Sequence, residues 1–373
     1  MFLGQGKMSV FKVAAAYIGT VVGAGFASGQ EVLQFFGYFG FWGLAGLILA
    51  TILFGYFGYL IMKIGNKLGA DSHLPVIKYA AGKWVGAFLD YVITFFLFGA
   101  LTIMAAGAGA LFSEQLGLSK LLGSVLLLAA TLGTVLLGLN GVISAIGMVV
   151  PILLGSVAGI AIYALLTVGM APEFSSAAME AGNPAVPFWP MAAVVYISYN
   201  LVLAVAVLAP MGKEAGELGI IKKGAIWGGV GLGLGAATIF LAMLVNMPQA
   251  ARFEIPMIFV AGKISPLVRF LYALVLFAEI YSTAVGSLYG FVVRFSTPQS
   301  KKLKIMAGGV CLASLAAAQW GFTNLVRILF PLVGYAGLFM LGGLTYQQLK
   351  GYLIEKGRWV LPQPAYKKTD KDK

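Results

Sequence analysis

The sequence is dominated by ten long apolar segments with short polar stretches between them, and this pattern constrains the fold more than any other feature. The segments are Val10–Phe36, Phe41–Ile64, Trp84–Phe112, Leu121–Leu139, Val142–Met170, Met191–Met211, Ile220–Met247, Pro266–Phe295, Ile305–Gln319 and Asn324–Gln348. A helix needs about 20 apolar residues to cross a bilayer, and most of these segments reach that length. Because backbone in lipid must satisfy its own hydrogen bonds, we expect each segment to be an α-helix.

Composition points to lipid as the surroundings of this chain. Of its 373 residues, 60% are apolar and only 10% are charged, whereas soluble domains carry about 25% charged residues. These values argue against a soluble enzyme, a nucleic-acid-binding protein and a secreted disulfide-rich module. The single cysteine, Cys311, and the single histidine, His73, leave no disulfide within the chain and no multi-histidine metal site. We therefore expect a lipid bilayer as the main partner, with no nucleic acid, no obligate protein partner, no enzyme activity and no bound cofactor.

The distribution of Lys and Arg predicts the orientation. With the N-terminus in the cytoplasm, 20 of the 25 basic residues fall on the cytoplasmic side, as the positive-inside rule requires. We expect a multi-pass protein of the cell (plasma) membrane with both termini in the cytoplasm. Its parts would be a cytoplasmic N-terminus (1–9), an extracellular loop (171–190) and a basic cytoplasmic tail (349–373). A short half-apolar stretch, Pro256–Ile264, is predicted to be a helix outside the bilayer.

The two halves of the chain resemble each other at an offset of 180 residues. Gly141 and Pro151 in the fifth segment correspond to Gly321 and Pro331 in the tenth. Each half, 10–170 and 191–348, has five spans, so the second half must be inverted relative to the first. Inverted repeats with interrupted helices are typical of secondary transporters. The predicted fold is therefore an all-α integral membrane protein with ten transmembrane helices in two inverted five-helix repeats.

The first segment contains an unusual concentration of glycine. Gly19, Gly23, Gly25 and Gly29 fall within eleven residues, and each costs a helix interior about 1 kcal/mol relative to alanine. We expect the helix to break near the midplane here, which lipid tolerates only where the freed backbone lines a cavity. The alternative is a face of small residues for close helix packing, which is common in membranes.

A break in the first segment would free backbone groups for binding. Amides near Ala24 and Gly25 suit an anionic group such as a carboxylate, and carbonyls at Gly19 and Val22 suit a cation. The predicted substrate-binding residues of this segment are Thr20, Gly23, Ala24, Gly25 and Phe26. The next polar residues, Gln30 and Glu31, lie on the outer side of the break and are predicted to form a gate.

Polar side chains also occur about midway through the sixth segment, where they are costly unless they face a cavity or a partner. They are Tyr196, Ser198, Tyr199 and Asn200. We predict that they bind substrate through hydrogen bonds and an aromatic lid, at a second broken helix that matches the first. The alternative is hydrogen bonding between helices.

The eighth segment carries Glu279, the deepest carboxylate of the chain. Ser282 and Thr283 share its helix face, at i+3 and i+4, and hydroxyl and carbonyl oxygens are the ligands that a small cation prefers. Glu279 is predicted to join them, to carry a coupling proton or to pair with a substrate ammonium group. The alternative is a protonated glutamate that bonds to a neighbouring helix.

The stretch Ala14–Glu31, with its Gly-Ala-Gly break, resembles the YkvI-like family of bacterial amino acid permeases. Ten spans in two inverted halves also resemble the leucine-transporter fold of the amino acid–polyamine–organocation superfamily. The likeness extends over residues 8 to 350.

The resemblance implies a sodium site between the first and eighth segments, built from backbone carbonyls and two adjacent hydroxyls. On this chain those positions are Gly19, Val22, Glu279, Ser282 and Thr283. The family-typical residue at the position of Glu279 is small, so this chain departs from the pattern there, and both Na⁺ and H⁺ stay open as the coupling ion.

These observations predict a secondary active transporter for a small amino-acid-like or other zwitterionic solute, coupled to Na⁺ or H⁺ and working by alternating access. Two alternatives stay open. One is a membrane receptor that senses substrate with a transporter fold, and the other is a channel.

Overall fold

The computed structural model describes residues 8–137, 149–169, 173–296 and 300–355, which form helices joined by turns with no strand among them. The first half contains α1 (Val10–Val21), α2 (Ala24–Ser28), α3 (Gln30–Phe35), η1 (Gly37–Phe39), α4 (Phe41–Leu68), α5 (His73–Leu116), α6 (Lys120–Leu136), α8 (Val149–Val168) and α9 (Glu173–Glu180). The second half contains α10 (Trp189–Ala215), α11 (Leu218–Leu244), η2 (Ala250–Arg252), α12 (Pro256–Ile264), α13 (Pro266–Val292), α14 (Lys301–Ala318) and α15 (Phe322–Glu355).

Six helices within the described residues are long and apolar enough to cross a membrane. They are Phe41–Leu68, His73–Leu116, Trp189–Ala215, Leu218–Leu244, Pro266–Val292 and Phe322–Lys350. Shorter apolar helices span Val10–Val21, Lys120–Leu136 and Gly155–Val168. The predicted short helix at Pro256–Ile264 is confirmed as α12. Gly141, one of the residues that suggested the repeat, lies outside the described residues.

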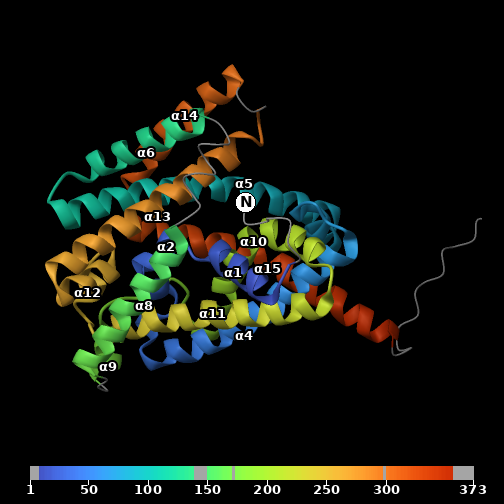
Figure 1. The fold of residues 1–373 in the computed structure, drawn as a ribbon, viewed down its shortest axis with the longest axis horizontal. Helices are drawn as coiled ribbons and strands as arrows, with labels where there is room; N and C mark the ends of the chain where they lie inside the picture. The colour runs from blue at the N-terminus through green and yellow to red at the C-terminus, as the bar shows by residue number, and fades with distance from the viewer. Residues whose placement is uncertain (1–7, 138–148, 170–172, 297–299, 356–373) are drawn as a thin grey trace, which may run out of the picture.

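The helices form two packed groups, each drawn from both halves of the chain (Figure 1). One group contains α1, α4, α10 and α11, and the other contains α5, α6, α13 and α14. Helix α15 packs against both α5 and α10, while α8 packs against α11 and α13. Helices at corresponding places in the two halves thus share a group.

The first apolar segment is interrupted twice. Helix α1 ends at Val21, and α2 begins at Ala24 after Val22 (ψ 118°) and Gly23 (φ −140°, ψ −174°) adopt extended backbone. Gly29 then takes a left-handed conformation (φ 81°) between α2 and α3, which glycine adopts without the steric cost that other residues carry. The glycine-rich sequence therefore does break the helix.

The predicted break in the sixth segment is wrong, because Trp189–Ala215 forms the single continuous helix α10. The run of small apolar residues in this segment is compatible with a continuous helix. The polar side chain of Asn200 forms its hydrogen bond with the backbone of the same helix. Its Nδ2 donates a 3.0 Å hydrogen bond to the carbonyl of Tyr196. Pro210 lies in the last two turns, where it leaves the middle of the helix intact.

Candidate functional site

The break in the first segment leaves buried backbone groups outside the helical ladder. The last bond of α1 runs from the Val22 amide to the Ile18 carbonyl (2.8 Å), and α2 starts with the Ala27 amide donating to Gly23 (3.0 Å). The carbonyls just before the break and the amides just after it therefore have no helical partner. Val22 is 3% exposed and Ala24 is 1% exposed. Buried backbone polar groups need partners, which makes this point a natural place for a ligand.

Helix α13 presents its hydroxyl face to the break. A Cβ atom added to Gly23 would lie 3.9 Å from Oγ1 of Thr283. Glu279 and Ser282 on the same helix are both buried, and the Ser282 hydroxyl donates a 3.0 Å hydrogen bond to the Glu279 carbonyl. The structure thus brings the end of α1 and the predicted hydroxyl pair of α13 to the same place.

The Glu279 carboxyl group is buried without a complete set of partners. Its side chain is 3% exposed, and Oε2 forms no hydrogen bond within the part of the chain that the structure describes. The alternative interpretation, a glutamate bonded to a neighbouring helix, therefore finds no support at that oxygen. An intramembrane carboxyl group in this position is available for a proton or a cation.

The second carboxylate near the break, Glu31, lies beside Gly25. A Cβ atom added to Gly25 would lie 3.4 Å from Oε2 of Glu31 and 3.3 Å from Cε2 of Phe330. Ser28 fixes the turn between them, because its hydroxyl donates to the Gly25 carbonyl (2.8 Å) and accepts from the Gln30 amide (3.2 Å). Glu31 was predicted as a gate, and the structure places it at the break itself.

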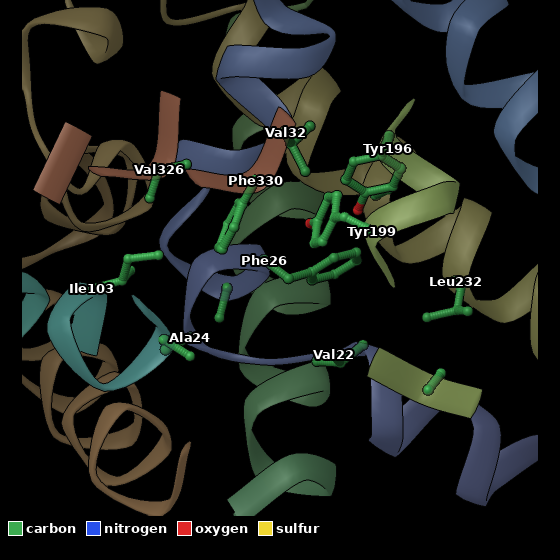
Figure 2. Packing of buried hydrophobic residues seen from close by; sticks show 14 of the residues in the cluster. Val22, Ala24, Phe26, Val32, Ile103, Tyr196, Tyr199, Leu232, Val326 and Phe330 are labelled. Carbon is green, nitrogen blue, oxygen red and sulfur yellow. The ribbon is translucent and has the colours of Figure 1, made fainter. Parts of the chain in front are cut away.

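Aromatic rings from three elements surround this position, and we call Phe35, Tyr196, Tyr199 and Phe330 the aromatic cluster. Tyr199 stacks on Phe330 with ring centroids 4.8 Å apart and planes at 9°. Tyr196 meets Tyr199 edge to face at 5.6 Å, and Phe35 lies 5.4 Å from Tyr196. Figure 2 shows Phe330 and Tyr199 side by side above Phe26 and Ala24. The hydroxyls of both tyrosines are buried and lack partners among the described residues.

Three predicted polar residues form hydrogen bonds within the protein instead. The Ser198 hydroxyl donates to the Gly334 carbonyl (2.7 Å) and so joins α10 to α15. The Thr20 hydroxyl donates to the Ala16 carbonyl (2.7 Å). The Asn200 amide donates to a carbonyl of its own helix, that of Tyr196. Ser198 therefore forms a hydrogen bond between helices, which was the alternative to substrate binding.

Two glutamines add buried acceptor atoms to α3. Gln30 and Gln34 are 1% and 2% exposed, and the Oε1 atom of each lacks a partner among the described residues. Neither Gln34 nor Phe330 was among the site residues predicted from the sequence. Phe330 directly precedes Pro331, one of the residues that mark the internal repeat, and that neighbourhood is the only sequence signal that singles it out.

Comparison with known proteins identifies relatives of this chain, although no protein-family model matches it. The uncharacterized membrane protein YkvI of Bacillus subtilis (strain 168) is 32% identical over 346 residues, which cover 91% of this chain and 96% of YkvI. The uncharacterized protein YyaD of the same organism is 29% identical over 336 residues, covering 87% of this chain and 92% of YyaD.

Three solved structures share the fold at low sequence identity. MhsT in complex with L-phenylalanine gives a TM-score of 0.61 at 16% identity, covering 93% of this chain and 98% of MhsT. The inward-facing conformation of Mhp1 gives 0.59 at 14%, covering 93% and 80%. The substrate-bound outward-open state of a Na⁺-coupled sialic acid symporter gives 0.57 at 16%, covering 91% and 80%. The architecture is therefore the leucine-transporter fold.

Proposed function

This chain belongs to the family of the Bacillus membrane protein YkvI, and from that premise we propose that it is a secondary active transporter rather than an enzyme. It would move a small organic solute that carries an amino group, coupled to Na⁺ or H⁺, by alternating access across the plasma membrane. Its ten spans would be the broken first segment, α4, α5, α6, the segment that includes α8, and α10, α11, α13, α14 and α15.

The observation that carries this proposal is the broken first segment, whose free backbone groups lie between two kinds of side chain. On one side lie the hydroxyl face and carboxyl group of α13, with Thr283 beside Gly23. On the other side lie Glu31 and the aromatic cluster, with Phe330 beside Gly25. We assign the first side to the coupling ion or proton and the second to the organic solute, because oxygen ligands suit a small cation and aromatic rings suit organic groups.

The exposure of the first segment supports one state of an alternating-access cycle. All residues of α2 and α3 are buried, whereas Ile18, Gly19 and Thr20 on the other side of the break are partly exposed. With the N-terminus in the cytoplasm, as the Lys and Arg distribution predicts, this asymmetry fits a conformation that is closed to the outside and accessible from the cytoplasm.

Uptake into proteoliposomes tests the proposal. The purified full-length protein is reconstituted and supplied with radiolabelled amino acids and amines under an imposed Na⁺ gradient or pH gradient. We expect saturable accumulation above equilibrium that collapses when the gradient is removed. Equilibration without accumulation would identify a channel, and saturable binding without flux would identify a receptor, so either result would contradict the proposal.

A further inference from the structure

Building on the proposed function, we infer that the transported solute is an organic cation whose ammonium group is held at Glu31 against the aromatic cluster. The inference narrows the solute from any amino-bearing molecule to one with net positive charge. It rests on three features of the described residues: an unpaired buried carboxylate, the rings around it, and the absence of a basic residue to bind a substrate carboxylate.

Glu31 is a buried carboxylate without an ion pair. Its side chain is 4% exposed. The four ion pairs among the described residues join His73 to Asp90, Lys120 to Glu254, Lys213 to Asp71 and Arg294 to Asp90. None of them involves Glu31. An ionised carboxylate in such a place is costly unless a positive group neutralises it, and a cationic solute supplies that group.

The groups around Glu31 suit an ammonium ion. Oε2 of Glu31 and the ring of Phe330 both approach the same point beside Gly25, at 3.4 Å and 3.3 Å. Tyr199 stacks on Phe330, and Tyr196 meets Tyr199 edge to face, so the ring beside this point belongs to a continuous group of aromatic side chains. Aromatic ring faces attract cations, and the attraction strengthens when water is excluded.

The unpaired buried side-chain atoms of the same region can all accept a hydrogen bond. The Oε1 atoms of Gln30 and Gln34 can only accept hydrogen bonds, and the hydroxyls of Tyr196 and Tyr199 can accept as well as donate. An ammonium group brings donors only, whereas a carboxylate brings acceptors only. These side-chain atoms therefore match the cationic end of a solute, while the free donors of the region are backbone amides at the start of α2.

Among the described residues, the helices that carry Glu31 and the aromatic cluster place no basic side chain where it could bind a solute carboxylate. Helices α2 and α3 contain no Lys or Arg, and in α10 the only one is Lys213, far beyond the aromatic cluster. On α15, Arg327 lies one turn from Phe330, but its side chain is exposed and it acts electrostatically on Tyr38. The two buried carboxyl groups, Glu31 and Glu279, thus have no ion-pair partner among the described residues.

Binding of matched ligand pairs tests this inference. Each pair is an amino acid and the amine left when its carboxylate is removed: phenylalanine and phenethylamine, leucine and isoamylamine, alanine and ethylamine, lysine and cadaverine. Affinity is measured by calorimetry on the purified full-length protein. We expect the amine to bind at least about tenfold more tightly than its amino acid in every pair that binds, because both carry the ammonium group but only the amino acid must also bury a carboxylate without a basic partner.

Two variants distinguish a specific role of Glu31 from the effect of removing any carboxylate. Glu31→Gln keeps the shape of the side chain and should weaken amine binding at least about tenfold, because the neutralising charge is lost. Glu180→Gln removes an exposed carboxylate of α9 and should leave amine affinity within about twofold of the wild-type value, because Glu180 lies outside the proposed site. Amine affinity unchanged in Glu31→Gln, or amino acids binding more tightly than their amines, would overturn the inference, and so would the absence of binding by every amine.

The uptake assay above keeps the two proposals distinguishable. Accumulation of amino acids without uptake of amines would leave the transporter standing and overturn the inference of a cationic solute. Amine binding that depends on Glu31, without any flux, would support the inferred site and contradict transport. The comparison of ligand pairs uses the wild-type protein, so it decides the question even if a variant does not fold.

Discussion

The hydroxyl of Tyr272 on α13 donates a 2.5 Å hydrogen bond to the carbonyl of Ala27 on α2. Because α2 ends at Ser28, this carbonyl lies outside the helical ladder and needs such a partner. The two residues are 245 positions apart in the chain. The bond therefore fixes the short helix beyond the break to the helix that carries Glu279.

Tyr272→Phe should destabilise this part of the structure. Removing the hydroxyl leaves the buried Ala27 carbonyl unsatisfied, which costs about 1–3 kcal/mol. We expect a lower thermal unfolding midpoint in detergent and weaker ligand binding, because α2 carries Gly25 and Phe26. Tyr289→Phe on the same helix is the control, since the Tyr289 hydroxyl forms no hydrogen bond among the described residues. Equal midpoints for the two variants would show that the bond does not hold α2 in place.

A side chain at Gly25 should disturb the proposed solute site. An added Cβ would meet the Phe330 ring at 3.3 Å, so the ring must move by a few tenths of an ångström, and would touch Glu31 at 3.4 Å. The branched side chain in Gly25→Val cannot be accommodated without displacing the ring, and overpacking of this kind costs about 1–3 kcal/mol. We expect Gly25→Val to abolish uptake and Gly25→Ala to reduce it.

Gly133→Val is the matched control for the glycine variants. Gly133 lies in α6, and an added Cβ there would meet no atom within 4 Å. Uptake by this variant should equal that of the wild-type protein. Full uptake by Gly25→Val at normal levels of folded protein would contradict a solute site at the break.

Glu279→Gln should uncouple transport from its driving ion. The substitution keeps the size of the side chain but removes its charge and its ability to bind a proton. We expect loss of accumulation under a Na⁺ or pH gradient, while exchange of labelled for unlabelled solute continues. Glu180→Gln on α9 is the control, since that carboxylate is exposed. Normal gradient-driven accumulation in Glu279→Gln would assign Glu279 a structural role only.

Cysteine labelling tests the predicted orientation. In a Cys311→Ala background, an impermeant maleimide applied to intact cells should label Ser176→Cys and should label Lys78→Cys only after permeabilisation. Both positions are exposed in the structure, and the Lys and Arg distribution places position 78 in the cytoplasm. Labelling of position 78 on intact cells would reverse the inside and outside assignment of every loop.

Local sequence patterns determined much of this protein. Long apolar segments indicated helices for a membrane, because only a helix satisfies its own backbone in lipid. The break in the first segment was also predictable, since four glycines weaken any helix in which they are this close together. The short helix at Pro256–Ile264 follows equally from its own residues.

The sixth segment shows the limit of that reasoning. Its polar residues suggested a second break, yet Asn200 bonds to its own helix and Ser198 bonds to Gly334 on α15. A polar side chain in a membrane needs a partner, but the sequence does not say whether that partner is a solute, its own backbone or another helix. Only the packed structure shows which of these partners the side chain has.

The composition of the site was likewise decided by tertiary structure. Phe330 lies beside Gly25, and Thr283 lies beside Gly23, although each pair is separated by more than half of the chain. Local periodicity indicates which residues share one helix face, but it cannot tell which faces of distant helices meet. Those contacts depend on how the two helix groups pack around the break, and that packing places Glu31, the predicted gate residue, beside Gly25 and Phe330.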